Sequence, residues 1–146
     1  HRQVAPFAAR YPGFDLGQAY AVTAELRRLR QRRGETSIGR KIGFTNRTIW
    51  AQYGVHAPIW GDMYDTTVRD VATDFSLALD TFTEPLIEPE IVFKLARDVD
   101  LAMDEGQLFD AMEWVAHGFE IVQSVFPGWR FTAAASLRLR AVVGFS

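Results

Sequence analysis

The chain has 146 residues, of which 48% are hydrophobic and 23% charged, with a formal net charge of -2 at pH 7 and no cysteine. The length suits one domain with a core of its own, and the composition is ordinary for a soluble globular protein. Without cysteine, disulfides, thiolate metal sites and a cysteine nucleophile are excluded, and we expect a cytoplasmic protein. The charge indicates neither nucleic acid nor an anionic membrane as a partner, and no membrane-spanning run or signal peptide is visible.

The first strong pattern predicts a helix over residues 16–33. Asp15 is a suitable N-cap, Gln18 completes a capping box, apolar residues follow at helical spacing, and Gly34 ends the helix. Arginines crowd the last turns, where positive charge suits the helix dipole. A solvated helix end accounts for these arginines better than an RNA-binding face does.

The next stretch, residues 37–46, has alternating apolar positions and is predicted to be a strand. Gly39 and Gly43 flank Lys41 on its own face of that strand, which leaves space for a small molecule beside the lysine. In such a partly dry position the pKa of a lysine can fall far enough for proton transfer near neutrality. The alternative is an ordinary exposed lysine.

Shorter elements are predicted before the middle of the chain. Asn46 can cap a short helix that ends at Gly54. The predicted elements are this helix over residues 47–53, a strand at Ile59–Tyr64, a polar loop over residues 65–74 and a strand over residues 75–80.

Residues 86–93 form an apolar, β-branched run that carries two glutamates two positions apart. Side chains alternate along a strand, so Glu88 and Glu90 share one face. The other face is expected to face a core; it holds Ile87, Ile91, Phe93 and Leu95. Two adjacent carboxylates in a half-buried strand repel each other, and a hard divalent cation removes that repulsion. The alternative is an exposed edge strand with a solvated acidic face, which Pro89 favours.

A third acid lies in a later apolar strand. Asp104 and Gln107 form a second capping box, and the apolar spacing after them predicts a helix that ends at Gly118. Residues 119–126 are predicted to be a strand, with Glu120 inside it. A third oxygen ligand would complete an open site for Mg²⁺ or Mn²⁺ rather than zinc. The alternative is a buried glutamate paired with an arginine.

Five short motifs occur in an order that resembles a known family. They are Gly39-Arg40-Lys41-Ile42-Gly43-Phe44-Thr45, Tyr53-Gly54-Val55, Pro58-Ile59-Trp60-Gly61, Ile87-Glu88-Pro89-Glu90-Ile91 and Phe119-Glu120-Ile121-Val122. Each motif is weak by itself. Together, within residues 6–132, they resemble the 2-oxopent-4-enoate hydratase and 4-oxalocrotonate decarboxylase family, which belongs to the fumarylacetoacetate hydrolase superfamily.

The resemblance implies a set of site residues. Glu88, Glu90 and Glu120 would ligate Mg²⁺ or Mn²⁺, and Lys41 would act beside the substrate as a catalytic acid, base or electrostatic group. The residues implied to bind substrate are Gly43, Thr45, Gly61 and Gln123. The metal would chelate the carboxylate and 2-oxo oxygens of a small 2-oxo acid and stabilise the dienolate formed next. Hydration and decarboxylation both need this stabilisation, so the motifs do not separate the two reactions.

The resemblance also implies an architecture. The expected fold class is α+β, a mixed, strand-rich β-roll of the fumarylacetoacetate hydrolase type with a helical N-terminal part, and the protein is expected to be a homo-oligomer. We expect one compact unit, in which residues 1–74 form an N-terminal α/β part with the Lys41 strand. Residues 75–146 would then begin the metal-binding β-roll.

The chain departs from the family in its length and in its last stretch. Family members continue well beyond this length, and residues 133–140 are more basic than the family pattern, with Arg138 and Arg140. We therefore expect an incomplete β-roll, from a truncated or frame-disrupted member.

Three functions remain open from the sequence. The first is a metal-dependent lyase, a hydratase or decarboxylase, that acts on small 2-oxo or 2-hydroxydienoic acids of aromatic catabolism. The second is a catalytically incomplete fragment that binds metal or self-associates without turnover. The third is a structural domain whose acids are salt-bridged, which predicts no thermal shift with Mg²⁺.

Overall fold

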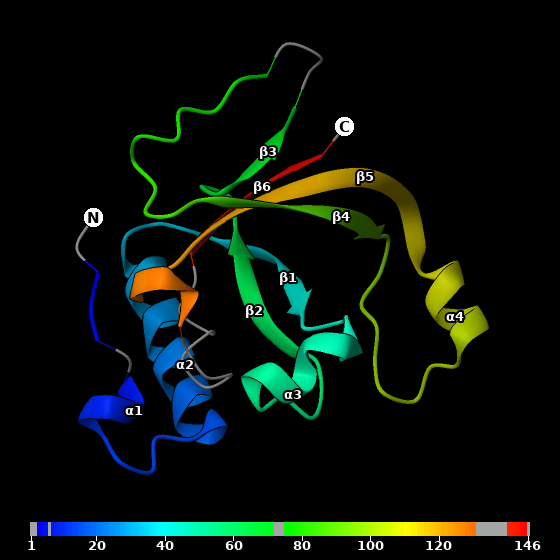
Figure 1. Cartoon of the computed structure of the whole chain (residues 1–146). Helices are drawn as coiled ribbons and strands as arrows, with labels where there is room; N and C mark the ends of the chain where they lie inside the picture. Colours follow the sequence, from blue (N-terminus) through cyan, green and yellow to red (C-terminus); the bar gives the residue numbers. More distant parts are fainter. Residues whose placement is uncertain (1–2, 6, 72–74, 131–139, 146) are drawn as a thin grey trace.

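This computed structural model describes residues 3–5, 7–71, 75–130 and 140–145 (Figure 1). Its helical elements are α1 (Phe7–Arg10), α2 (Leu16–Arg32), η1 (Arg47–Ile49), α3 (Trp50–Tyr53), α4 (Glu105–Asp110) and η2 (Pro127–Trp129). Its strands are β1 (Ser37–Gly43), β2 (Ile59–Tyr64), β3 (Val68–Asp70), β4 (Leu86–Leu95), β5 (Met112–Gln123) and β6 (Arg140–Phe145). None of the described helices is long and apolar enough to cross a bilayer.

The strands form two sheets. β1 and β2 pair antiparallel, and the other four strands form a sheet in the order β3-β6-β5-β4. This second sheet is mixed, because β3 and β6 run parallel whereas β5 is antiparallel to both of its neighbours. Figure 1 shows α2 beside the β1–β2 sheet and below the long β4–β5 pair, which reaches toward α4 at the far end. Helices combined with one antiparallel and one mixed sheet confirm the predicted α+β class.

Two predicted capping boxes are present. The Asp15 carboxylate accepts a hydrogen bond from the Gln18 backbone N–H at 2.8 Å, and the Gln18 side chain accepts one from the Asp15 N–H at 3.2 Å. Asp104 and Gln107 make the same reciprocal pair at the start of α4. Each box satisfies backbone donors that a helix start leaves unpaired, which is why the sequence signal was reliable here.

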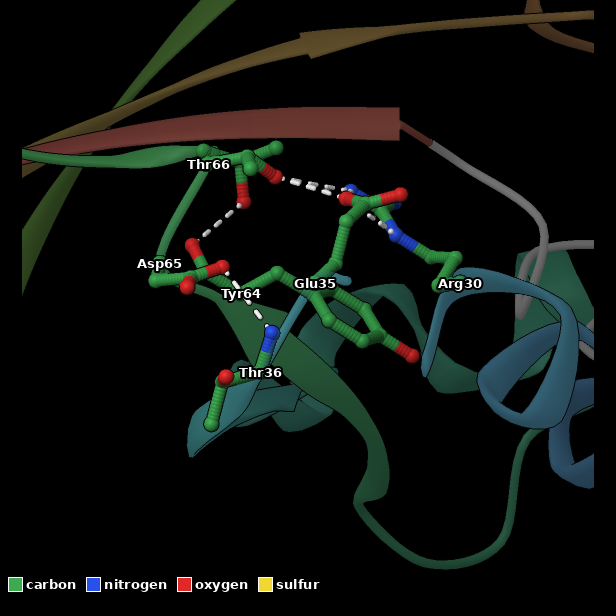
Figure 2. Close-up of polar contacts among 7 residues, drawn as sticks. Arg30, Glu35, Thr36, Tyr64, Asp65 and Thr66 are labelled. Atoms are coloured by element: carbon green, nitrogen blue, oxygen red, sulfur yellow. Dashed lines mark hydrogen bonds and ion pairs between the residues drawn. The ribbon is translucent and has the colours of Figure 1, made fainter. Parts of the chain in front are cut away.

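A polar network joins the turn after α2 to the turn after β2 (Figure 2). Arg30 donates to the Glu35 carboxylate from Nη2 at 2.5 Å, and the Thr66 hydroxyl donates to the same oxygen at 2.6 Å. The hydrogen bonds from Thr66 and Arg30 lower the pKa of Glu35. The Thr36 N–H donates to the Asp65 carboxylate at 3.0 Å, one residue before β1 begins. The network therefore fixes the starting point of β1, the strand that carries Lys41.

The β4–β5 pair is the longest feature of the fold. Its antiparallel register places Glu88 opposite Glu120 and Glu90 opposite Gly118. At Gly118 an added Cβ would lie 2.7 Å from Val92 Cγ2 and 2.9 Å from the Gly144 carbonyl oxygen. Because backbone cannot yield to such a contact, only glycine allows β5 to pack closely between β4 and β6.

The predicted helix before Gly118 is wrong over most of its length. α4 ends at Asp110, and residues 112–117 belong to β5. Each of these residues except Glu113 has a register partner on β4, as in the pairs Lys94 with Trp114 and Phe93 with Val115. Strand pairing over ten residues of β4 therefore overrides the helical spacing of Leu108, Met112 and Val115.

Two further predictions between β2 and β4 are wrong. Residues 75–80 do not form a strand although they alternate, and Val68–Asp70, within the predicted polar loop, forms β3. Val68 pairs with Val143, far along the chain. Local alternation cannot reveal a partner at that distance, whereas residues 75–80 have the pattern but pair with no strand in the described part of the chain.

Contrary to prediction, no core of described residues covers the apolar face of β4. The exposed fractions on it are 66% for Ile87, 63% for Ile91, 52% for Phe93 and 44% for Leu95. The described core includes Ile121, Val122 and Phe126 at the other end of β5, together with Ile59 and Tyr64 of β2. The prediction failed because alternation shows which residues share a face, not whether another layer covers that face. The basic stretch over residues 133–139 lies outside the described residues.

Replacing Phe126 with alanine should destabilise the fold, because Phe126 is 0% exposed. Loss of a buried phenylalanine side chain costs about 3–5 kcal/mol. Phe109→Ala is the matched control, since Phe109 is 73% exposed and exposed substitutions change stability by about 0.5 kcal/mol or less. Urea denaturation measures the free energy of unfolding of each variant. Equal losses of this free energy in the two variants would show that Phe126 is not part of the core.

Candidate metal centre

Three carboxylates from two adjacent strands converge at one point. β4 supplies Glu88 and Glu90, which share a face because side chains alternate along a strand. β5 supplies Glu120, directly opposite Glu88 in the register. One carboxylate oxygen from each of the three residues lies within 4.8 Å of the other two. The structure thus brings together the three acids that the sequence singled out.

The environment of these acids opposes their negative charge. Glu120 is 2% exposed, and Glu90 is half-buried. Burial raises the pKa of Glu90 above its ordinary 4.5, a change that the Lys41 ammonium opposes and the Glu88 carboxylate reinforces. Burial favours the neutral form of a carboxyl group, so positive charge has to compensate for it if all three acids are ionised.

Lys41 supplies positive charge from the other sheet. Its Nζ lies 2.8 Å from Glu88 Oε2 and 3.7 Å from Glu90 Oε1, and it also forms an ion pair with Glu120 Oε2. β1 brings the lysine there, with Gly39 and Gly43 on the same face of the strand. β1 therefore brings Lys41 beside the three acids, and the alternative of an ordinary exposed lysine does not describe this side chain, which is 27% exposed.

The acids and the lysine line a cavity of about 810 Å³ between the two sheets. Gly43, Thr45 and Gly61, three of the residues expected to bind substrate, also line it. Gln123 does not. Its buried side chain accepts a hydrogen bond from the Thr83 N–H at 3.0 Å, which holds the loop before β4. The role of each of these four residues in binding substrate stays a prediction.

Sequence reasoning did not assign Asp62 to the site, although it lines the same cavity. Its side chain is 5% exposed and pairs with Arg27 at 3.5 Å. The Ser37 hydroxyl donates to it at 3.1 Å. An aspartate inside the apolar run of β2, next to Gly61, was the available signal. Its partners here give it a structural task, because they join α2, β1 and β2 beside the cavity.

The acids fit a hard divalent cation. Oxygen-to-cation distances of about 2.0–2.6 Å allow two ligands of one ion to lie up to about 4–5 Å apart, which suits these three oxygens. Glu120 Oε2 is buried and has no hydrogen-bond partner among the described residues, so only an ion pair compensates it. An all-carboxylate set favours Mg²⁺, Mn²⁺ or Ca²⁺ over zinc or copper. Glu88, Glu90 and Glu120 would hold such an ion.

Curated relatives of the chain are lyases that act on small dienoic and oxo acids. The chain is 32% identical over 130 residues to the 2-hydroxyhexa-2,4-dienoate hydratase of Comamonas testosteroni, covering 88% of this chain and 49% of the relative. It is 32% identical over 113 residues to a 4-oxalocrotonate decarboxylase of a Pseudomonas species, covering 75% of this chain and 43% of the relative. The chain thus spans about half the length of these relatives. No family model matches it.

Solved structures show the same fold. The 4-oxalocrotonate decarboxylase of Pseudomonas putida G7, complexed with magnesium and adipate, superposes with a TM-score of 0.82 at 24% identity. The match covers 99% of this chain and 56% of that one. The same decarboxylase complexed with calcium and acetate gives a TM-score of 0.79 at 23% identity. The resemblance drawn from the five motifs is therefore confirmed: the chain is a homologue of the 2-keto-4-pentenoate hydratases and of 4-oxalocrotonate decarboxylase.

Proposed function

We propose that the chain carries the active site of a divalent-metal-dependent lyase, a hydratase or decarboxylase that acts on small 2-oxo or 2-hydroxydienoic acids. The observation that carries the proposal is the convergence of Glu88, Glu90 and Glu120 with Lys41 in one cavity. Magnesium in one related solved structure and calcium in another support a divalent cation, with Mg²⁺ or Mn²⁺ as our expectation.

Each group of the site has a separate task in this proposal. Glu88, Glu90 and Glu120 hold the cation, which when bound supplies Lewis acidity toward a 2-oxo acid and lowers the cost of negative charge on its oxygens. Lys41 holds a proton at Nζ, beside the carbon chain of the substrate, and acts as the catalytic acid or base. The apolar side chains of Ile42 and Leu86 also line the cavity and offer contacts to the carbon chain of a substrate.

Hydration and decarboxylation both need negative charge to be stabilised at the same end of the substrate. The enolate route expected from the family resemblance is part of the proposal and serves either reaction. The curated relatives include both kinds of enzyme. The expected homo-oligomer and cytoplasmic location also remain part of the proposal.

A second candidate is a catalytically incomplete fragment that binds metal or self-associates without turnover. One observation favours it. No described residue covers the apolar face of β4, where Ile87 is 66% exposed. An exposed apolar face of this kind is a site of association between proteins. The two candidates differ in one measurable property, which is turnover.

Turnover should be Mg²⁺-dependent and seen as loss of the ultraviolet absorbance of a 2-hydroxydienoate. Lys41→Ala and Glu90→Ala should each lower kcat at least about 100-fold, because one removes the proton donor and the other a charged ligand. Lys94→Ala is the matched control, since Lys94 pairs with the exposed Glu113 at 2.8 Å, outside the cavity. A folded sample that binds Mg²⁺ without turnover would reject the lyase and leave the second candidate.

As the pH is lowered, Mg²⁺ affinity should begin to fall at a higher pH than it would for a site of glutamates with the ordinary pKa. A cation binds the ionised carboxylate, and the pKa of Glu90 is raised above 4.5 chiefly by burial. Protons therefore begin to compete at a higher pH, so affinity is full well above the raised pKa and is lost as pH falls through it. Calorimetric titrations across the acidic range measure this loss.

The control for this pH dependence is Glu90→Gln, because a glutamine side chain at this position cannot ionise. It should bind Mg²⁺ at least about tenfold more weakly, with a smaller change in affinity over the same pH range. Wild-type affinity that stays constant until the pH reaches 4.5 would contradict the raised pKa.

A further inference from the structure

We propose that Lys41 is a built-in counter-ion that exchanges with the divalent cation. Its ammonium group leaves the three carboxylates when the cation binds, and it then faces the cavity where the substrate lies. This inference rests on the proposed metal site. It adds that the cation brings the catalytic lysine into its working position, so that metal binding and lysine placement are one event.

The position of the ammonium group is the first observation. Lys41 Nζ makes ion pairs with all three acids, at 2.8 Å to Glu88 Oε2 and 3.7 Å to Glu90 Oε1 and in direct contact with Glu120 Oε2. Those carboxylates offer oxygens within 4.8 Å of one another. The ammonium group thus lies where the three acids converge, and it is the ion-pair partner of the buried Glu120 oxygen.

A divalent cation held by the same oxygens needs the same place. Its bonds to oxygen are about 2.0–2.6 Å long, whereas an ammonium group lies about 2.7–2.9 Å from a carboxylate oxygen. The two positive centres cannot share one position, and like charges at contact repel each other strongly where water is scarce. Binding of the cation therefore requires Nζ to move away.

The surroundings of Lys41 give its side chain room for that movement. Gly39 and Gly43 flank it on the same face of β1, and Gly61 lies opposite it on β2. A Cβ added at Gly61 would meet nothing within 4 Å, and one added at Gly43 would lie 4.0 Å from Lys41 Cε. Lys41, Gly43 and Gly61 all line the cavity. Gly43 and Gly61 therefore leave a path for the ammonium group from the acids into the cavity.

The chain's own composition makes the exchange measurable. It has two lysines, Lys41 and Lys94, and Lys94 pairs with the exposed Glu113 away from the acids. Limited acetylation with an amine-reactive ester, read by peptide mass spectrometry, gives the labelling ratio of Lys41 to Lys94. We expect MgCl₂ to raise this ratio at least threefold over NaCl of matched ionic strength, since an ammonium group released from three carboxylates is more accessible to the reagent.

Calorimetry with MgCl₂ provides the second measurement. Lys41→Met keeps the length of the side chain without its charge, so this variant should bind Mg²⁺ at least fivefold more tightly than the wild type, while Lys94→Met should bind as the wild type does. Circular dichroism checks that the variants are folded. A result in which Lys41→Met binds Mg²⁺ and the wild type does not would support the exchange in its strongest form.

Two results would overturn the exchange while leaving the proposed function in place. One is a labelling ratio that stays constant or falls although calorimetry shows bound Mg²⁺. The other is a Lys41→Met variant that binds Mg²⁺ no more tightly than the wild type. Absence of binding by both folded proteins would overturn the proposed metal site and the exchange together, so the failures are distinguishable.

Discussion

Repulsion among three carboxylates at one point is the constraint on which the rest of the structure depends. Glu88, Glu90 and Glu120 are held together by the antiparallel register of β4 and β5, and that register leaves them no means of separating. A positive charge has to come from elsewhere, and it comes from Lys41 on the other sheet. The ion pairs therefore join two sheets that share no strand, and the cavity lies along that junction.

Much of the candidate site could be predicted from the sequence, because local rules specify it. Strand alternation was enough to place Glu88 and Glu90 on one face, and the glycines beside Lys41 marked a strand with open space. Glu120 stood out as an acid in an apolar strand. What placed it opposite Glu88 is the pairing of β4 with β5, which no local pattern reveals. The five motifs in order supplied that link through the family resemblance.

The parts of the fold that could not be predicted depend on distant partners. β3 is a strand because Val143 pairs with Val68, and residues 112–117 are extended because β4 lies beside them. The exposed face with Ile91 and Phe93 was misjudged for the same reason, since burial depends on a covering layer. Capping boxes succeeded at Asp15 and Asp104 because all their partners lie within three residues.

The place of β6 has a consequence for synthesis on the ribosome. β6 lies inside the mixed sheet, between β3 and β5, yet it is built from residues 140–145. The β4–β5 hairpin and its three glutamates leave the exit tunnel first, so one edge of β5 stays unpaired while translation continues. An unpaired edge recruits strands from neighbouring chains. Until residues 140–145 have emerged, the edge of β5 that β6 later covers is therefore available for pairing with a strand of another nascent chain.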